Sequence, residues 1–150
     1  MNKEIASYPL SLLAKQKGFN LDTYARWGYP PHGEKPYLSE HNSGYEEYSI
    51  CKHNWNDETM PAPYPNEAYR GQCSAPTLNR LQTWLREKHG LAVLVDIDTS
   101  MPHPYYFKIY QSIENTEPVL LVESGLSDQT YNEALSRGLE ECLENFITNE

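Results

Sequence analysis

The feature that most constrains the fold of this chain is the hydrophobic pattern of residues 74–150, which predicts a helix, three strands and a second helix. Residues 74–90 place their apolar side chains on one helical arc, and Gly90 ends that helix. The arc consists of Leu78, Leu81, Trp84, Leu85 and His89. Residues 91–98, 105–112 and 118–123 are rich in β-branched and aromatic residues and are separated by short polar turns. Such short connections favour an antiparallel meander of three strands.

The second helix begins with a capping box, in which Thr130 is followed three residues later by Glu133. An apolar stripe then runs along the helix and consists of Tyr131, Ala134, Leu135, Gly138, Leu139, Cys142, Leu143, Phe146 and Ile147. Cys142 lies on this stripe and is predicted to be a core residue. An α-β-β-β-α order with short turns should place both helices on one face of the sheet, so we expect an α+β fold.

The opposite face of this sheet needs a separate explanation. In either register it carries Leu94, two of Tyr106, Lys108 and Tyr110, and a leucine or valine of the third strand. Leaving these side chains bare would expose a large apolar patch. We expect the aromatic N-terminal half of the chain, or a second subunit, to cover them.

The N-terminal half has a weaker pattern. A short helix is expected near the start, with Ser7 or Tyr8 before its first turn, Pro9 within that turn and Gly18 at its end. Between residues 20 and 73 no helical or strand periodicity persists, and the segment is rich in tyrosine, tryptophan, proline and glycine. We predict that this segment is irregular but ordered, and we allow for a small hairpin within it.

Length and composition limit the class of protein. A chain of 150 residues can bury one core without disulfides or metals, so we expect a single domain over residues 1–150, in which residues 1–73 precede a core of residues 74–150. The formal net charge of -9, from 12 Lys+Arg against 21 Asp+Glu, argues against nucleic-acid binding through general positive charge. The 3 cysteines are too few for a disulfide scaffold and fit a reducing cytoplasm. The N-terminus lacks a signal-peptide core and no stretch approaches a membrane span, so we expect a cytoplasmic protein without a membrane partner.

Acidic residues near one end of the predicted sheet are the first candidates for catalytic chemistry. Asp96 and Asp98 alternate along the first strand and point to one side, and Glu123 ends the third strand, which runs parallel to the first. His103 lies in the turn that leads into the second strand. Three carboxylates and an imidazole at one edge could hold Mg²⁺ or Mn²⁺ for phosphodiester cleavage. The alternative is that they are ordinary polar residues at strand ends beside turns.

A second candidate site combines histidine and cysteine. The residues His41, Cys51, His53 and Cys73 offer the nitrogen and sulfur ligands that zinc prefers in tetrahedral sites. Their spacing is not that of a usual zinc motif, and cysteines of this kind are often simply buried. Both interpretations stay open at the level of sequence.

Aromatic residues of the N-terminal half are the third candidates, as a binding surface. They are Tyr24, Trp27, Tyr29, Tyr37, Tyr45, Tyr48 and Trp55. Tyrosine and tryptophan are favoured at recognition surfaces because they offer a large contact area with few rotatable bonds and a polar tip. The alternative is that these rings cover the bare face of the sheet.

Two resemblances add expectations. The segments 74–90, 13–19 and 130–143 read SAPTLNRLQTWLREKHG, LAKQKGF and TYNEALSRGLEECL. They resemble a family of short hypothetical proteins from Bacteroides and their phages or mobile elements, which implies such an origin and a cytoplasmic setting. The α-β-β-β-α order also resembles the double-stranded RNA-binding domain, which reads A-form RNA by shape and phosphate contacts. That family has a lysine cluster at the start of its last helix, whereas residues 127–133 here contain acidic residues and no lysine, which argues against RNA binding.

The chain has no nucleotide-binding loop, nucleophile elbow or closed metal motif, so no cofactor is predicted. We therefore expect a small protein-binding module of phage or mobile-element origin that has no catalytic activity, and we allow for a homo-oligomer. The first alternative is a metal-dependent phosphodiesterase or nuclease that uses the strand-end carboxylates. The second alternative is nucleic-acid binding through the C-terminal half.

Overall fold

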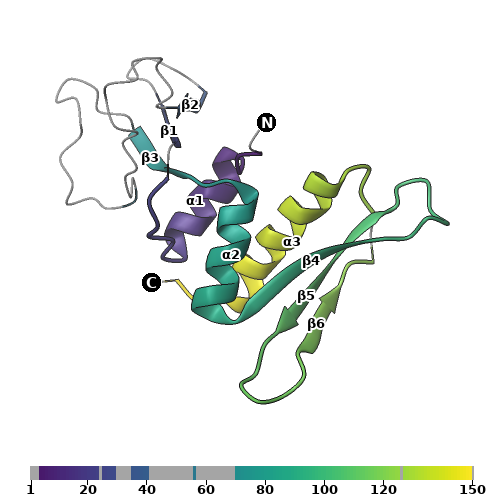
Figure 1. The fold of residues 1–150 in the computed structure, drawn as a ribbon. Coiled ribbons are helices and arrows are strands. Elements are labelled where there is room, and N and C mark those ends of the chain that lie inside the picture. The colour runs from purple at the N-terminus through teal and green to yellow at the C-terminus, as the bar shows by residue number, and fades with distance from the viewer. Residues whose placement is uncertain are drawn as a thin grey trace, which may run out of the picture. The chain divides into compact units, whose positions relative to one another are not determined.

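The computed structural model describes residues 4–23, 25–29, 35–40, 56, 70–125 and 127–149 of the chain (Figure 1). The chain divides into two compact units. The C-terminal unit comprises Thr77–Asn149 together with Glu4, and the N-terminal unit is drawn from Ile5–Pro76. Each unit has its own three-stranded antiparallel sheet and at least one helix, so the predicted α+β fold class is confirmed. The expectation that the whole chain is a single domain stays a prediction.

The C-terminal unit contains the predicted meander. Its strands are β4 (Leu91–Ile97), β5 (Tyr105–Gln111) and β6 (Val119–Glu123), in the order β4-β5-β6. Neighbouring strands are antiparallel, and the two connections are short turns. Asn115 in the second turn adopts a positive φ of 62°, a conformation that asparagine tolerates better than most residues.

Helix α2 (Leu78–His89) precedes the meander and has defined caps at both ends. The Thr77 side chain accepts a hydrogen bond from the Arg80 N–H at 3.1 Å, and Gly90 ends the helix with a positive φ of 67°. The helix therefore begins later than the sequence suggested. Pro76 lies before the N-cap, because the residues before Pro76 belong to a strand.

Helix α3 (Tyr131–Phe146) follows the meander and contains the predicted capping box at Thr130 and Glu133. Most of its apolar stripe is buried, including Leu135, Leu139, Leu143 and the predicted core residue Cys142. The two aromatic residues at its ends are the exceptions. Tyr131 is 45% exposed and Phe146 is 37% exposed.

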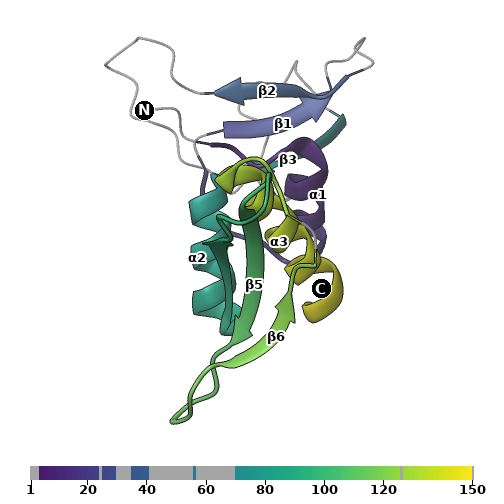
Figure 2. The same ribbon diagram turned by 90° about the vertical axis from the view of Figure 1, so that its right-hand side faces the viewer.

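One face of the meander, which we call the covered face, packs against the helices. Figure 2 views the sheet from the other side, with α2 and α3 behind it. Helix α3 contacts β4 and β5, and α2 contacts β4 and α3. Val93 and Ile109 are fully buried on this face. Gly138 allows α3 to approach closely, because a Cβ atom there would lie 2.6 Å from Val93 Cγ1 and 2.9 Å from Phe107 Cγ.

The N-terminal unit begins with the predicted helix, α1 (Tyr8–Gln16). The Ser7 side chain caps its first turn by accepting a hydrogen bond from the Leu10 N–H. Gly18 follows the helix with a φ of +86°, and the Phe19 N–H returns to Ala14 O at 2.9 Å. Both ends of this helix are therefore as the sequence predicted.

A second sheet lies where the sequence predicted an irregular segment. Its strands are β1 (Ala25–Tyr29), β2 (Tyr37–Glu40) and β3 (Arg70–Ala75), in the order β2-β1-β3. The β1–β2 pair matches the small hairpin allowed by the prediction, but β3 was not expected. Strand β3 joins β1 across a long stretch of chain, and a pairing between distant segments leaves no local periodic signal.

Two polar side chains tie this unit together. The Trp27 Nε1–H donates to Ala6 O at 2.9 Å. Asn56 Nδ2 donates to Phe19 O at 2.7 Å, while Asn56 Oδ1 accepts from the Ser74 N–H at 2.9 Å. Buried backbone groups of three separated segments thereby gain partners.

Candidate functional site

The open face is the side of the β4–β6 sheet that points away from α2 and α3, toward the viewer in Figure 2. Because cross-strand partners point to the same face, the register assigns its residues directly. They are Ala92, Leu94 and Asp96 of β4, Tyr106, Lys108 and Tyr110 of β5, and Leu120 and Glu123 of β6. This assignment settles the register that the sequence had left open and places all three polar and aromatic β5 residues on the open face.

An ion pair lies on the open face. Lys108 Nζ lies 3.0 Å from Asp96 Oδ2, and the Tyr106 hydroxyl donates to the same oxygen at 3.3 Å. The other carboxylate oxygen of Asp96 accepts a hydrogen bond from the Ile97 N–H at 2.8 Å. That backbone bond and Lys108 together lower the pKa of Asp96 below its usual value, and the bond to Asp96 raises the pKa of Lys108. Both groups are therefore charged at neutral pH and already partnered.

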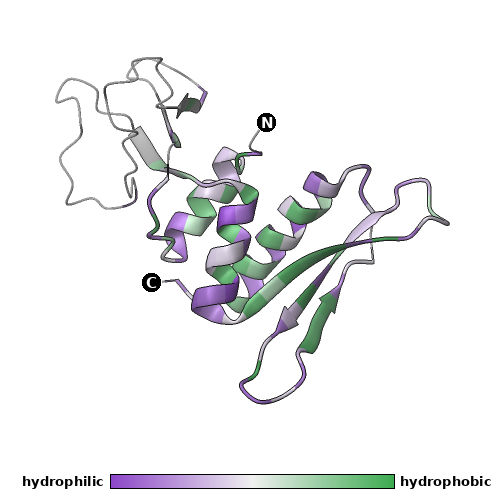
Figure 3. Cartoon of the chain, in the orientation of Figure 1, coloured by the Kyte–Doolittle hydropathy of each residue, from purple (hydrophilic) through white to green (hydrophobic). Residues whose placement is uncertain are grey.

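Apolar side chains on the open face are exposed on both sides of this ion pair. Leu94 is 48% exposed and Leu120 is 44% exposed, and Tyr106 and Tyr110 of the central strand β5 are half-buried. Figure 3 shows hydrophobic residues along β4 and β6 as well as along α3. Apolar surface of this kind is usually buried in a protein core or an interface.

A shallow hollow of about 330 Å³ lies at the β4 side of this surface. Its lining residues come from both helices and from two strands: Gln82, Leu94, Val95, Asp96, Lys108, Tyr110 and Tyr131. The hollow is open to solvent, and its charged residues are the ion pair described above. It can therefore receive a side chain of a partner, but it does not enclose a small molecule.

The outer edge of β4 is capped by side chains. The register places the backbone groups of Val93 and Ile97 on the side of β4 that faces away from β5. The Gln82 side chain donates to Val93 O, and the Ile97 N–H is taken by the Asp96 carboxylate. The other edge strand, β6, has five residues and an irregular register against β5. Such caps, short strands and irregularities hinder the addition of a further strand.

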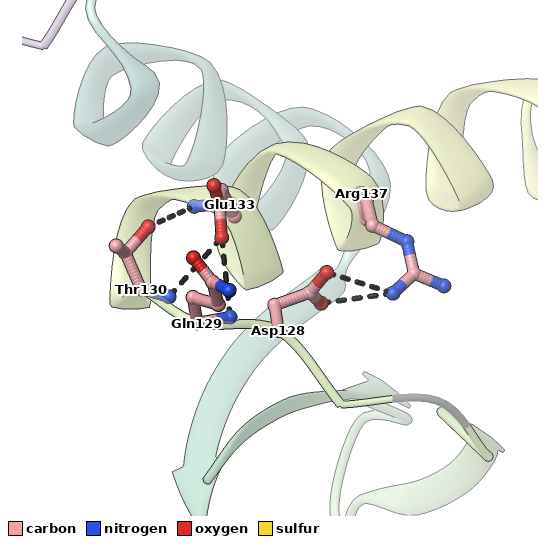
Figure 4. Close-up of polar contacts among 5 residues, drawn as sticks. All are labelled: Asp128, Gln129, Thr130, Glu133 and Arg137. Carbon is pink, nitrogen blue, oxygen red and sulfur yellow. Dashed lines mark hydrogen bonds and ion pairs between the residues drawn. The ribbon is translucent and has the colours of Figure 1, made fainter. Parts of the chain in front are cut away.

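The start of α3 is held by acidic side chains (Figure 4). Glu133 Oε2 accepts hydrogen bonds from the Gln129 and Thr130 N–H groups at 3.1 and 3.2 Å, and the Glu133 N–H donates to Thr130 Oγ1 at 3.2 Å. Arg137 Nη1 lies 2.9 Å from both carboxylate oxygens of Asp128. Carboxylates therefore occupy the N–H groups and the guanidinium that a phosphate would need, which makes this helix end a poor phosphate site.

The proposed catalytic residues are not brought together as a group of metal ligands in the described part of the chain. The Asp96 carboxylate is bound by Lys108, and Asp98 accepts hydrogen bonds from the backbone and side chain of Ser100 at 3.0 and 2.6 Å. His103 and Glu123 are exposed. Within the described residues, no three His, Cys, Asp or Glu side chains are grouped closely enough to hold a metal ion. The physical reason is that Asp96 and Asp98 are used in local pairing and turn formation, which leaves no convergent set of ligands.

The proposed zinc ligands can be placed only in part. His41, Cys51 and His53 lie outside the described residues. Cys73 is fully buried on β3, and burial raises the pKa of its thiol to about 12. Cys142 on α3 is likewise buried, with a pKa raised to about 12 by burial. Both cysteines are neutral thiols at physiological pH and so contribute apolar surface to the protein interior.

The proposed aromatic binding residues are also placed only in part. Tyr24, Tyr45, Tyr48 and Trp55 lie outside the described residues, and for Tyr29 and Tyr37 only the strand backbone is described. Trp27 is half-buried and packs edge to face against Tyr8, with ring centroids 6.2 Å apart. Together with its hydrogen bond to Ala6, this contact gives Trp27 a structural role. The expectation that the N-terminal half covers the open face concerns segments that are largely outside the described residues.

Sequence reasoning missed two residues of this region. Gln82 is not part of the predicted apolar arc of its helix, yet its side chain caps the edge of β4. Tyr131 was assigned to the buried stripe, yet it lines the hollow. The helical period gave no signal for Gln82, since a polar residue at the border of an apolar arc is indistinguishable from a solvated one.

Comparisons with known proteins do not assign this chain to a family. No protein-family model matches it, and no curated protein or solved structure was found to match it. None of the helices in the described segments combines the length and apolar character that a membrane span requires. The candidate site therefore rests on the geometry of the open face.

Proposed function

We propose that this protein is a non-catalytic module that binds another protein through the open face of its β4–β6 sheet. The observation that carries the proposal is the exposure of Leu94 and Leu120, at 48% and 44%, on the face opposite the helices. Burying such side chains against a partner is worth about 25 cal/mol per Å² of apolar surface before the costs of association.

The polar groups of the open face favour binding over catalysis. Asp96 is engaged by Lys108, Tyr106 and a backbone N–H, so its carboxylate is not positioned to accept a proton from a substrate. A partnered ion pair within an apolar surface fixes the register of a partner more than it adds affinity. The arrangement is that of a recognition surface, in which apolar side chains lie on both sides of an ion pair that can orient the partner.

We further propose that the protein acts in the cytoplasm. The resemblance to short Bacteroides and phage proteins and the buried, neutral thiols of Cys73 and Cys142 support a reducing, cytoplasmic environment. The partner is then expected to be a protein of the same compartment.

Site-specific photo-crosslinking in the cells that naturally produce the protein tests this function. A benzophenone amino acid is placed at Leu94, at Leu120 or, as a matched control, at Phe146, which is an exposed apolar residue of α3. We expect a protein adduct of one defined mass from the first two positions and not from the third. The crosslinked peptides are then identified by mass spectrometry.

Two results would contradict the proposal. Equal crosslinking from all three positions would mean that the contacts reflect general stickiness of exposed apolar residues. If neither open-face position gives a protein adduct, this face does not bind a protein in these cells.

A further inference from the structure

We infer that the segment of the partner that docks on the open face is a basic amphipathic helix. This inference rests on the proposed function and names the chemistry of its partner. It follows from three properties of the C-terminal unit: the charge of the meander, the shape of the open face and the obstruction of the sheet edges. The charge disfavours a second copy of this chain, the sheet edges disfavour an extended peptide, and the shape suits a helix.

The charge of the meander favours a basic partner. Residues 91–123 contain one lysine and five acidic residues, Asp96, Asp98, Glu114, Glu117 and Glu123. The single lysine, Lys108, is already paired with Asp96 at 3.0 Å. The remaining carboxylates lie on the open face or in the two turns that border it, and they are exposed. Lysine or arginine residues of a partner would therefore lie near these exposed carboxylates, both on the open face and in the two turns.

The same region concentrates the exposed apolar surface. Of the eight large apolar side chains that are exposed among the described residues, six belong to the meander and its turns. Leu94 and Leu120 lie on the open face, and Met101 and Ile113 lie in the two turns beside it; the other two, Ile97 and Val119, are at strand ends on the covered face. The partner must therefore present an apolar stripe between its basic residues. An α-helix with apolar residues three and four positions apart supplies this pattern.

The shape of the open face suits a helix. A sheet buries a face by packing a helix or a second sheet against it, and the covered face of this same sheet already packs against α3. A helix on the open face would contact Leu94, Tyr110 and Leu120, which come from all three strands. The hollow beside β4 could receive one larger side chain of that helix.

The edges of the sheet disfavour an extended peptide. A peptide strand would have to pair with β4 or β6, but Gln82 and Asp96 occupy outward backbone groups of β4. Strand β6 is short and irregularly registered. Removing the two β4 caps would cost about one hydrogen bond each, roughly 1 kcal/mol per bond, before any gain from strand addition.

A second copy of this chain is disfavoured by charge. Two open faces brought together would place like carboxylates opposite one another, since each meander carries five acids against one lysine. Like charges held in contact oppose association and select against that partner. A basic helix meets no such opposition.

Binding to a defined peptide tests this inference on the full-length protein. The probe is a synthetic, fluorescently labelled helix of about 18 residues built from leucine and lysine in a helical amphipathic pattern. One control peptide has the same composition in scrambled order, and another has glutamate in place of lysine. Affinity is measured by fluorescence anisotropy at several salt concentrations from about 0.05 to about 0.5 M.

Matched variants locate the binding surface. Leu94→Lys should weaken binding of the basic helix by about ten-fold or more, whereas Phe146→Lys should leave it within about two-fold. Glu123→Gln should weaken binding by about two- to five-fold, and Glu144→Gln on the exposed side of α3 should not. Circular dichroism confirms that each variant is folded. Binding by the basic amphipathic peptide alone, with this dependence on the face and with weakening by salt, supports the inference.

Several outcomes would overturn it. Equal binding of the scrambled or glutamate peptide would remove the requirement for a basic amphipathic helix. Equal loss of binding in Leu94→Lys and Phe146→Lys would remove the open face as the site. A dimer in analytical ultracentrifugation that Leu94→Lys dissociates would make a second copy the occupant. If the photo-crosslinker at Leu94 captures a partner while the basic helix does not bind, only this inference fails; if it captures none, the proposed function fails first.

Discussion

On the covered face of the β4–β6 sheet the side chains of Val93 and Ile109 are fully buried, whereas on the open face Leu94 is 48% exposed. The same three strands supply both faces, because successive residues of a strand point to opposite sides. The covered face is apolar and packs against α3, while the open face mixes apolar groups with the Asp96–Lys108 ion pair. One face therefore carries stability, and the other can change without unfolding the unit.

The largest contrast between the two faces is expected for leucine truncations. Leu139→Ala removes a fully buried side chain of α3 and should lower the free energy of unfolding by about 2–5 kcal/mol. Leu120→Ala on the open face should change it by no more than about 0.5 kcal/mol. Urea unfolding followed by circular dichroism measures both values. A similar loss in the two variants would mean that the open face is packed as tightly as the covered face.

A smaller loss in the free energy of unfolding is expected from a substitution at Gly138, where α3 approaches the sheet. Gly138→Ala adds a Cβ atom 2.6 Å from Val93 Cγ1, so α3 must shift away, which should cost about 1–3 kcal/mol. A gain in helix propensity of up to about 1 kcal/mol offsets part of this cost, so the net loss of stability should be about 2 kcal/mol or less. Ser136→Ala on the same helix is the control and should stay within about 0.5 kcal/mol of the wild type. A stabilised Gly138→Ala protein would show that the contact between α3 and the covered face is looser than the geometry indicates.

The N-cap of α3 should contribute less to stability than the two contacts described above. Thr130→Ala removes the acceptor of the Glu133 N–H and should destabilise the C-terminal unit by about 1 kcal/mol. Thr130→Ser keeps the oxygen and should recover most of that loss. The measurement is the urea midpoint of unfolding. Equal midpoints for the alanine and serine variants would mean that the hydroxyl does not hold α3 on the covered face.

The smallest effect is expected at the ion pair of the open face and depends on pH. The folded protein lowers the pKa of Asp96, so the charged carboxylate favours folding above its usual pKa, and that contribution is lost as the pH falls through the folded value. Asp96→Asn should therefore make the stability of the protein fall less steeply below about pH 4.

The partner variant separates the two causes of this shift. Lys108→Met leaves the hydrogen bond from the Ile97 N–H to Asp96, so it should remove only part of the pH dependence. For Lys108 the sign is opposite: its raised pKa favours folding below the usual lysine value, and that contribution is lost as the pH rises through the folded value. Thermal unfolding at a series of pH values records both. Curves identical to the wild type would mean that the pair does not persist in solution.

Local signals in the sequence predicted much of the C-terminal unit. Thr130 with Glu133 marked the start of α3, and Gly90 marked the end of α2. Leu94 was predicted to lie on the face opposite the helices, and the burial of Leu91 and Val93 but not of Leu94 agrees with this alternation. Such signals are short-range, because caps and alternation depend on residues only a few positions apart.

The sequence predicted several of the residues that lie on the open face, but it did not predict the contacts that they make there. The sequence indicated that Leu94 and two of Tyr106, Lys108 and Tyr110 would share the face opposite the helices. It also suggested Asp96 as a metal ligand, whereas the structure pairs Asp96 with Lys108. These two residues are 12 positions apart in the chain, and only the β4–β5 register brings them together.

The sequence by itself therefore determined the helices with their caps and the alternating strands of the meander. The tertiary structure alone decided the pairing of β3 with β1, the capping of the β4 edge by Gln82 and the exposure of Tyr131. The physical reason is the range of the interactions. Caps and periodicity act within a few residues, whereas strand pairing, edge capping and burial depend on segments that are brought together only when the chain folds.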